Sequence, residues 1–183
     1  MKNLNLILAG VFFTLAASFG GLVLSGQVQL GQLNRAPAEE GGPLFPVNES
    51  GLAIQGRQVY LSLGCVTCHT QQVRPAGLGN DIVRGWASRP SVARDYILQS
   101  EVLLGNRRLG PDLVNYGARV KSDNEVHTYL RTPMAGSVMP AYGFLYKQAK
   151  DGSFRPTEDA IALVTYLRSL NIEYSSPEAK LKQ

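Results

Sequence analysis

Two cysteines separated by two residues and followed at once by a histidine, Cys65-Val66-Thr67-Cys68-His69, constrain this chain more than any other feature. This spacing is typical of c-type haem attachment. The two thiols can add to the two vinyl groups of one porphyrin, and the adjacent imidazole can bind the iron from the proximal side. We therefore predict that Cys65, Cys68 and His69 hold one covalently attached haem c.

Other chemistry also uses a Cys-x-x-Cys pair, namely a redox dithiol, half of a zinc site, or a disulfide. A closed zinc site would need two more thiol or imidazole ligands. The chain has two cysteines and one further histidine, His127, so such a site would have to borrow carboxylates. A redox dithiol usually follows a strand and opens a βαβ unit, and no such pattern is visible. The sequence favours haem, with the dithiol as the main alternative.

Residues 1–33 are predicted to form a transmembrane anchor helix and its extension. No charged residue occurs from Asn3 to Asn34. At 1.5 Å per residue, the apolar run from Leu4 to Leu24 reaches roughly 30 Å, the thickness of the hydrocarbon core of a bilayer. A cleavable signal peptide is the alternative interpretation, because small residues at 15–18 could be cut. The apolar run continues beyond them, which favours an uncleaved anchor.

The side of the membrane follows from two signals. Lys2 precedes the apolar run, which indicates a cytoplasmic amino terminus. Haem is attached to reduced thiols outside the bacterial cytoplasm, so the haem motif belongs in the periplasm. We expect a single-pass protein of the bacterial inner membrane.

The rest of the chain is predicted to be a linker over 34–50, a cytochrome c domain over 51–175 and a tail over 176–183. The linker is rich in Pro and Gly. The domain is expected to be mainly helical, because no strand pattern competes. This gives the fold class: mainly α, with one N-terminal transmembrane helix plus a helical domain that carries the haem motif.

Four helices are expected in the domain. Helical spacing predicts one over 53–63, leading into the haem motif, and one over 92–98 with Ser91 as N-cap. Ser122 followed by Glu125 is a capping-box signature that predicts a third. Pro156 and Thr157 open the last helix. Its buried stripe is predicted to be Ala160, Ile161, Val164 and Leu167.

A six-coordinate haem needs a second axial ligand opposite His69. The candidates are Met139, Met134 and His127. Met139 is favoured, because thioether ligands commonly arrive on loops and the following Pro140 stiffens this one. His69/Met139 ligation fills both axial positions of the iron, which favours electron transfer over oxygen binding or catalysis. No catalytic residue is expected in this chain.

Other residues are candidates to support the haem. In the segment Gly110-Pro111-Asp112-Leu113, a backbone carbonyl at Pro111 could accept a hydrogen bond from the free ring nitrogen of His69. Arg74 and Arg108 are candidates to neutralise haem propionates, for which guanidinium geometry is well suited. They belong to a larger set between the haem motif and Met139: Arg74, Arg84, Arg89, Arg94, Arg107, Arg108, Arg119 and Arg131. The net charge is only +4 without a Lys/Arg run, so we expect no nucleic-acid partner.

Further motifs accompany the haem motif in order. They are Gly56-Arg57-x-x-Tyr60, Gln71-x-x-Arg74-Pro75, Ser91-Val92-x-Arg94-Asp95-Tyr96, Arg108-x-Gly110-Pro111-Asp112-Leu113, Asn115-x-Gly117-x-Arg119 and Ser137-x-Met139-Pro140-x-Tyr142. With these motifs, the chain resembles, over nearly its whole length, the monohaem cytochrome c subunit (subunit II, FixO/CcoO type) of cbb3-type haem–copper oxidases.

The resemblance implies a class I cytochrome c fold, ligation by His69 and Met139, and electron transfer to a haem–copper catalytic membrane subunit that reduces oxygen to water and pumps protons. A further cytochrome c subunit or a soluble cytochrome c would be the electron donor. The alternatives are a free-standing anchored cytochrome that shuttles between complexes, the small subunit of a nitric oxide reductase, and a thiol–disulfide oxidoreductase.

Overall fold

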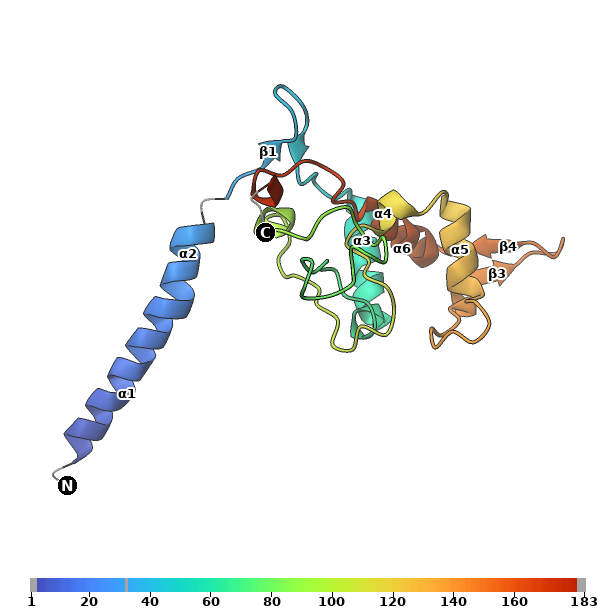
Figure 1. The fold of residues 1–183 in the computed structure, drawn as a ribbon. Coiled ribbons are helices and arrows are strands. Elements are labelled where there is room, and N and C mark those ends of the chain that lie inside the picture. The colour runs from blue at the N-terminus through green and yellow to red at the C-terminus, as the bar shows by residue number, and fades with distance from the viewer. Residues whose placement is uncertain (1–2, 32, 181–183) are drawn as a thin grey trace. The chain divides into compact units, whose positions relative to one another are not determined.

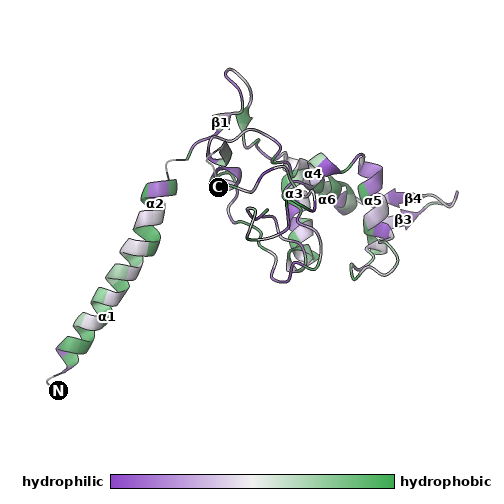
Figure 2. Ribbon diagram, in the orientation of Figure 1, coloured by the Kyte–Doolittle hydropathy of each residue, from purple (hydrophilic) through white to green (hydrophobic). Residues whose placement is uncertain are grey.

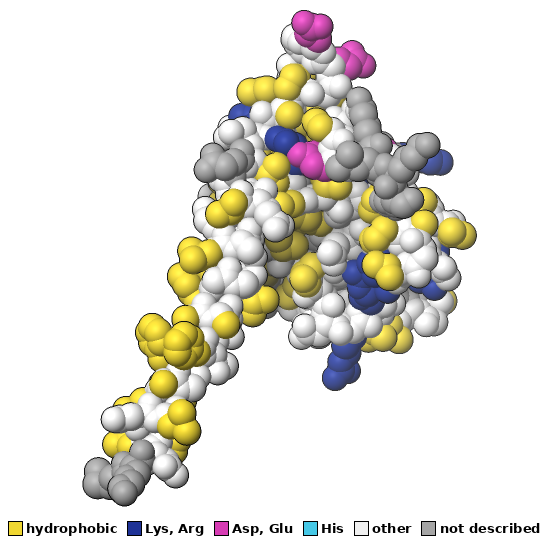
Figure 3. Space-filling model, turned by 60° about the vertical axis from the view of Figure 1, so that its left-hand side comes forward, with side chains coloured by type: hydrophobic (Ala, Val, Ile, Leu, Met, Phe, Trp, Pro, Cys, Tyr) yellow, Lys and Arg dark blue, Asp and Glu magenta, His cyan; other side chains and the backbone are white. Residues whose placement is uncertain are grey.

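The computed structural model describes residues 3–31 and 33–180. The chain divides into two compact units, Met1–Arg35 and Ala36–Gln183 (Figure 1). The first contains one continuous helix of 27 residues, Leu4–Leu30. None of the residues in its most apolar window is buried. Figure 2 shows that most of the helix is hydrophobic by residue, and Figure 3 shows hydrophobic side chains along it. By length and composition this helix could span a membrane, as predicted.

Two hydroxyl side chains of the anchor helix bond to the main chain of the helix itself. The helix consists of α1 (Leu4–Ser18), a π-helical turn (Phe19–Leu24) that contains Gly20 and Gly21, and α2 (Ser25–Leu30). The hydroxyl of Thr14 donates to the carbonyl of Gly10 at 2.8 Å, and that of Ser25 donates to the carbonyl of Gly21. Such bonds to the preceding turn let a hydroxyl enter an apolar environment with its donor satisfied.

The second unit is built on two helices that cross closely, α3 (Gly51–Ser62) and α6 (Glu158–Ser169). A Cβ atom at Gly56 of α3 would lie 1.9 Å from the carbonyl oxygen of Ala162, so only glycine allows this approach. The rings of Tyr60 and Tyr166 meet edge to face at the crossing, with centroids 5.5 Å apart. Main-chain amides of α3 and α6 are capped by the hydroxyls of Ser50 and Thr157, respectively.

Two shorter helices complete the helical part, α4 (Tyr116–Arg119) and α5 (Asp123–Arg131). The Ser122 hydroxyl caps α5 by accepting from the Glu125 amide at 3.3 Å, as predicted. The Glu125 carboxylate accepts from the amide of Lys121 at 3.0 Å, one residue earlier than in a standard capping box. The mainly helical fold predicted from the sequence is confirmed.

The buried face of α6 differs from the predicted stripe at one position. Ala160, Val164 and Leu167 are buried as expected, but Ile161 is 43% exposed. The buried residues include Leu163 and keep an i, i+3, i+4, i+7 spacing, and Ile161 is one residue out of that register.

The predicted helix over 92–98 is wrong. The structure has one 3₁₀ turn there, Ala93–Tyr96, with Val92 at its N-cap position. Ser91, the expected cap, accepts instead from the amide of Val73 at 3.0 Å. Side-chain contacts to other segments hold this stretch and replace the hydrogen bonds of a longer helix.

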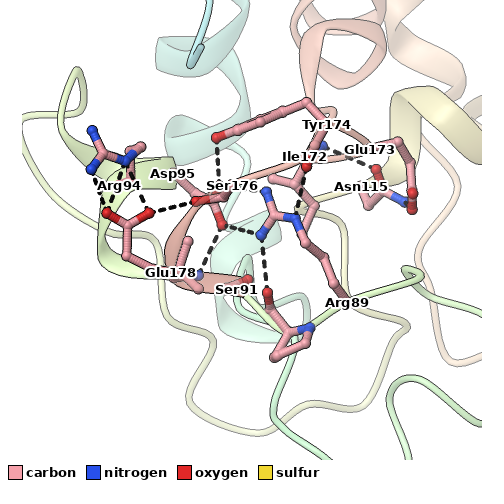
Figure 4. A network of polar contacts seen from close by, with 12 residues as sticks. Arg89, Ser91, Arg94, Asp95, Asn115, Ile172, Glu173, Tyr174, Ser176 and Glu178 are labelled. Atoms are coloured by element: carbon pink, nitrogen blue, oxygen red, sulfur yellow. Dashed lines mark hydrogen bonds and ion pairs between the residues drawn. The ribbon is translucent and has the colours of Figure 1, made fainter. Parts of the chain in front are cut away.

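Those contacts form a polar network around Asp95 (Figure 4). The Asp95 carboxylate accepts from both terminal nitrogens of Arg89, at 2.7 and 2.9 Å, and from the Tyr174 hydroxyl at 2.5 Å. The guanidinium of Arg94 binds Glu178 nearby, with its Nε 3.0 Å from the carboxylate. The network therefore ties the C-terminal segment to the stretch after the haem motif.

Two short antiparallel strand pairs were not predicted. They are β1 (Ala36–Pro37) with β2 (Leu44–Phe45), and β3 (Tyr146–Gln148) with β4 (Phe154–Pro156). The first pair lies within the predicted linker, and the ring of Phe45 stacks on that of Tyr174 with centroids 4.4 Å apart. Residues 36–45 thus belong to the second unit. In the predicted tail, Ser176 is buried, and residues 181–183 lie outside the described residues.

Candidate haem-binding site

The cysteine motif begins where α3 ends. Gly64 adopts a left-handed conformation, φ 71°, which turns the chain from α3 into the 3₁₀ turn Cys65–Thr67. The amides of Cys68 and His69 donate to the carbonyl of Cys65 at 3.2 and 3.0 Å, so the motif is a compact turn. Both cysteines are half-buried, and no disulfide joins them. No group of three or more His, Cys, Asp or Glu side chains suited to a metal ion occurs within 3–31 and 33–180, so no zinc cluster accompanies the pair there.

The imidazole of His69 is held from two sides. Its Nδ1 lies 2.8 Å from the carbonyl oxygen of Pro111. Because a carbonyl only accepts, Nδ1 carries the proton and Nε2 is left with a lone pair. Behind the ring, a Cβ atom at Gly110 would lie 2.2 Å from Cε1. Burial lowers the pKa of His69, which favours the neutral form able to bind a metal.

The loop that presents Pro111 is shaped by a buried carboxylate. Asp112 is fully buried, and its two oxygens accept from the amides of Gln72 and Val114, both at 2.9 Å. Burial raises the pKa of Asp112, and these two hydrogen bonds act in the opposite direction. On the other side, the Tyr60 hydroxyl donates to the main-chain carbonyl of His69 at 3.3 Å. The position of His69 is therefore fixed through its ring and through its backbone.

A cavity of about 370 Å³ opens beside the ring. Both His69 and Met139 line it, and most of the remaining wall is apolar: Leu113, Tyr116, Val120, Val126, Tyr129, Leu130, Pro133 and Leu167. An apolar cavity with an imidazole and a thioether in its wall, adjoining two thiols in sequence, has the donor set of a six-coordinate haem c. The residues present thus fit this group.

The other candidate ligands are placed differently. Met134 also lines the cavity, but it is 68% exposed, whereas Met139 is half-buried and packs against the core. His127 does not line the cavity, and its Nδ1 lies 3.0 Å from the hydroxyl of Tyr146. Ligation by Met139 stays a prediction; Met139 lines the same cavity as His69.

Arg74 and Arg108 do not line this cavity. The guanidinium of Arg74 donates to Asp81 at 2.8 Å, and that of Arg108 donates to the same carboxylate at 3.0 Å. Their predicted contact with haem propionates stays a prediction. Arg119 lines the cavity instead. The sequence places it in the motif Asn115-x-Gly117-x-Arg119, but that motif gives no sign that its side chain faces the cavity.

The guanidinium of Arg119 is half-buried in the wall of the cavity. Its described side-chain hydrogen bonds go to main-chain carbonyls, those of Asp112 and of Asn115, the latter at 3.4 Å. It also lies over the ring of Tyr116, 5.6 Å from the centroid. Burial lowers the pKa of Arg119. The cavity wall also contains Glu125. A half-buried cation whose described hydrogen bonds go to main-chain carbonyls would still gain from a further carboxylate in the cavity.

Comparison with protein families identifies the family to which the chain is similar. The model of the family described as "Cytochrome C oxidase, mono-heme subunit/FixO" matches residues 6–183, nearly the whole chain. Comparison with curated proteins gives no match.

Proposed function

This chain belongs to the FixO family of mono-haem cytochrome c oxidase subunits, and from that membership and the cavity we propose that it carries electrons to the catalytic subunit of a cbb3-type oxidase. The observation that supports this most directly is the presence of His69 and Met139 in the wall of one apolar cavity. When bound there through Cys65 and Cys68, a haem would supply an iron that alternates between two oxidation states.

The residues of the chain supply orientation and electrostatics in this proposal. Pro111 keeps the proton on Nδ1 of His69, so that Nε2 would be free to bind the iron. His69 and Met139 would together hold the iron, and an iron held by both suits electron transfer and not oxygen binding. Arg119 would offset the charge of a haem carboxylate. The chain would then transfer electrons, and the chemistry of oxygen would belong to another subunit.

The membrane arrangement is part of the proposal. The helix Leu4–Leu30 would remain uncleaved in the inner membrane, with the amino terminus in the cytoplasm and the haem domain in the periplasm. As an oxidase subunit the chain has partner subunits. We propose a haem–copper membrane subunit as the electron acceptor and a further cytochrome c as the donor.

The packing of residues 36–45 favours a fixed subunit over a free shuttle. With β1 and β2 paired and Phe45 stacked on Tyr174, only residues 31–35 separate the anchor helix from the second unit. At no more than about 3.6 Å per residue, a tether of five residues can span at most roughly 18 Å. Family membership likewise favours an oxidase over a nitric oxide reductase or a thiol oxidoreductase.

Purification of the native complex in mild detergent tests this function. We expect this chain to co-purify with a haem–copper subunit, and its pyridine haemochrome spectrum to show the c-type band. A chain recovered alone, carrying haem c, would support the shuttle instead. A colourless chain made with an active haem-attachment system would contradict the proposal.

A further inference from the structure

Two loops that follow the haem motif in sequence, residues 76–86 and 105–109, meet at one buried carboxylate. Asp81 is fully buried and is held by the guanidinium of Arg74, from the segment after the motif, and by that of Arg108. Burial by itself would raise the pKa of Asp81, but the hydrogen bonds from the two arginines outweigh it and lower the pKa to about 2. Asp81 is therefore an anion that fixes residues 76–86 against residues 105–109.

The second of these loops lies directly beside the haem motif. The amide of Arg107 donates to the carbonyl of Thr67 at 3.3 Å, and the amide of Gly110 donates to the carbonyl of Cys68 at 3.1 Å. Gly110 also backs the ring of His69. Side chains exposed on this loop are thus close to the edge at which the haem would be attached.

Together, the two loops expose apolar and basic side chains. Leu78, Val83 and Leu109 are 72%, 87% and 58% exposed. On the same two loops, Arg84 and Arg107 are exposed, and the guanidinium of Arg84 lies over the ring of Trp86, 5.1 Å from its centroid. We call the surface of Leu78, Val83, Arg84, Arg107 and Leu109 the arginine–leucine face.

The charged side chains that the two loops expose to solvent are all positive. Residues 74–86 and 104–110 contain the arginines 74, 84, 107 and 108, and Asp81 is their single acidic residue. Because the Asp81 carboxylate is buried, the charge presented to solvent is positive. Three exposed aliphatic side chains among arginines match the composition of a protein–protein interface. Such interfaces are enriched in arginine and bury apolar side chains.

We propose that the arginine–leucine face docks a redox partner protein with an acidic surface, and that one electron crosses there. This rests on the proposed function. The step oxidises the reduced centre of the partner and reduces the haem iron by one electron, without making or breaking a bond. The arginines attract and orient the partner, and the aliphatic side chains exclude water at the contact. Asp81 is a positioning residue that aligns the two loops.

The test uses the native complex and reduced flavodoxin, an acidic redox protein, as the probe. The double variant Arg84→Glu, Arg107→Glu reverses the exposed charge. The matched control is Lys147→Glu, Lys150→Glu, which reverses the charge of two exposed lysines in the β3–β4 hairpin. Figure 1 shows this hairpin beyond α5, away from the loops that follow α3. The rate of haem reduction is measured by stopped flow, and flavodoxin binding to the oxidised complex by calorimetry.

We expect the arginine variant to slow reduction and weaken binding by at least about tenfold near 10 mM ionic strength, and the loss to shrink as salt rises. The lysine variant should change both by less than about twofold. The midpoint potential of the haem should be unchanged in both. In Asp81→Asn, where the exposed arginines remain but the carboxylate that aligns the two loops is lost, the salt dependence should persist with a lower rate.

Equal losses in the arginine and lysine variants would overturn the docking site, as would an arginine variant with unchanged rate and affinity. A variant that lost binding to phosphatidylglycerol vesicles while keeping its rate with flavodoxin would assign the face to lipid and also overturn it. In each case the haem spectrum would be intact. Failure of the proposed function would instead appear as missing haem, so the two failures are distinguishable.

Discussion

Gly110 lies directly behind the imidazole of His69, and a Cβ atom there would fall 2.2 Å from Cε1 and 2.6 Å from Nδ1. The same Nδ1 is 2.8 Å from the carbonyl oxygen of Pro111. Two consecutive residues thus support the ring and fix its tautomer. A glycine is required here by close approach rather than by backbone conformation.

Gly110→Ala should therefore displace the ring of His69 and weaken its bond to the iron. We expect a shifted midpoint potential and a fraction of protein with altered haem absorption. Gly51→Ala is the control, because no atom lies within 4 Å of a Cβ atom at Gly51. Potentiometric titration with optical detection checks both variants. Identical titrations for Gly110→Ala and the unsubstituted protein would contradict the support assigned to this glycine.

Met139→Ala should abolish the far-red absorption band that reports a bond between thioether sulfur and ferric iron. The same measurement on Met134→Ala should retain the band, because Met134 is mostly exposed. His127→Ala should also retain it, because His127 contacts Tyr146 outside the cavity. If the band disappeared only in Met134→Ala, the second axial position would belong to that residue and not to Met139.

The parts of the site that could be predicted are those encoded by neighbours in sequence. The haem motif is one continuous segment, and the caps of α5 and α6 depend on residues three apart. The contact between the Pro111 carbonyl and His69 could also be predicted from the sequence, because proline in a Gly-Pro-Asp turn has a restricted backbone. The mainly helical class followed from the spacing of apolar residues.

The parts that could not be predicted depend on contacts between distant segments. Nothing local shows that Asp81 binds Arg108, 27 residues away, or that Arg119 faces the cavity. The stretch 92–98 has helical spacing, but Asp95 binds Arg89 and Tyr174, and the helix is replaced by one turn. Likewise, a linker rich in Pro and Gly gave no sign that Phe45 would stack on Tyr174.

Arg119→Gln should lower the midpoint potential of the haem. A cation in the cavity wall stabilises the reduced iron, which carries one less positive charge, and its removal favours the oxidised form. The titration of a haem carboxylate near Arg119 should also move to higher pH, since the neighbouring cation no longer favours its charged form.

Arg155→Gln is the control for Arg119→Gln. It removes one positive charge from β4, where Arg155 is exposed and does not line the cavity. Measuring the potential of both variants from pH 5 to 9, in steps of about one unit, separates the two effects. A lower potential in both variants by the same amount would indicate a general charge effect and would remove the specific role of Arg119.

The ion pair between Arg94 and Glu178 should make the C-terminal segment sensitive to acid. The hydrogen bond from Arg94 is the main reason that the pKa of Glu178 falls from its ordinary value of 4.5 to about 2. A carboxyl whose pKa is lowered by folding stabilises the native state fully above its unfolded pKa. That contribution is lost as the pH falls through the pKa of the folded state. Glu178 should therefore stabilise the protein fully above about pH 4.5, less as the pH falls below it, and not at all once the pH is well below about 2.

Glu178→Gln isolates this contribution, because it keeps the shape of the side chain and removes the charge. The difference in denaturation midpoint between the native chain and Glu178→Gln should be largest near neutral pH and should narrow in acid. In an Arg94→Gln background, the same substitution should give a small difference with little pH dependence, since the partner is gone. A difference that stayed constant from neutral pH to pH 3, or that persisted in the Arg94→Gln background, would show that Glu178 acts through packing and not through its charge.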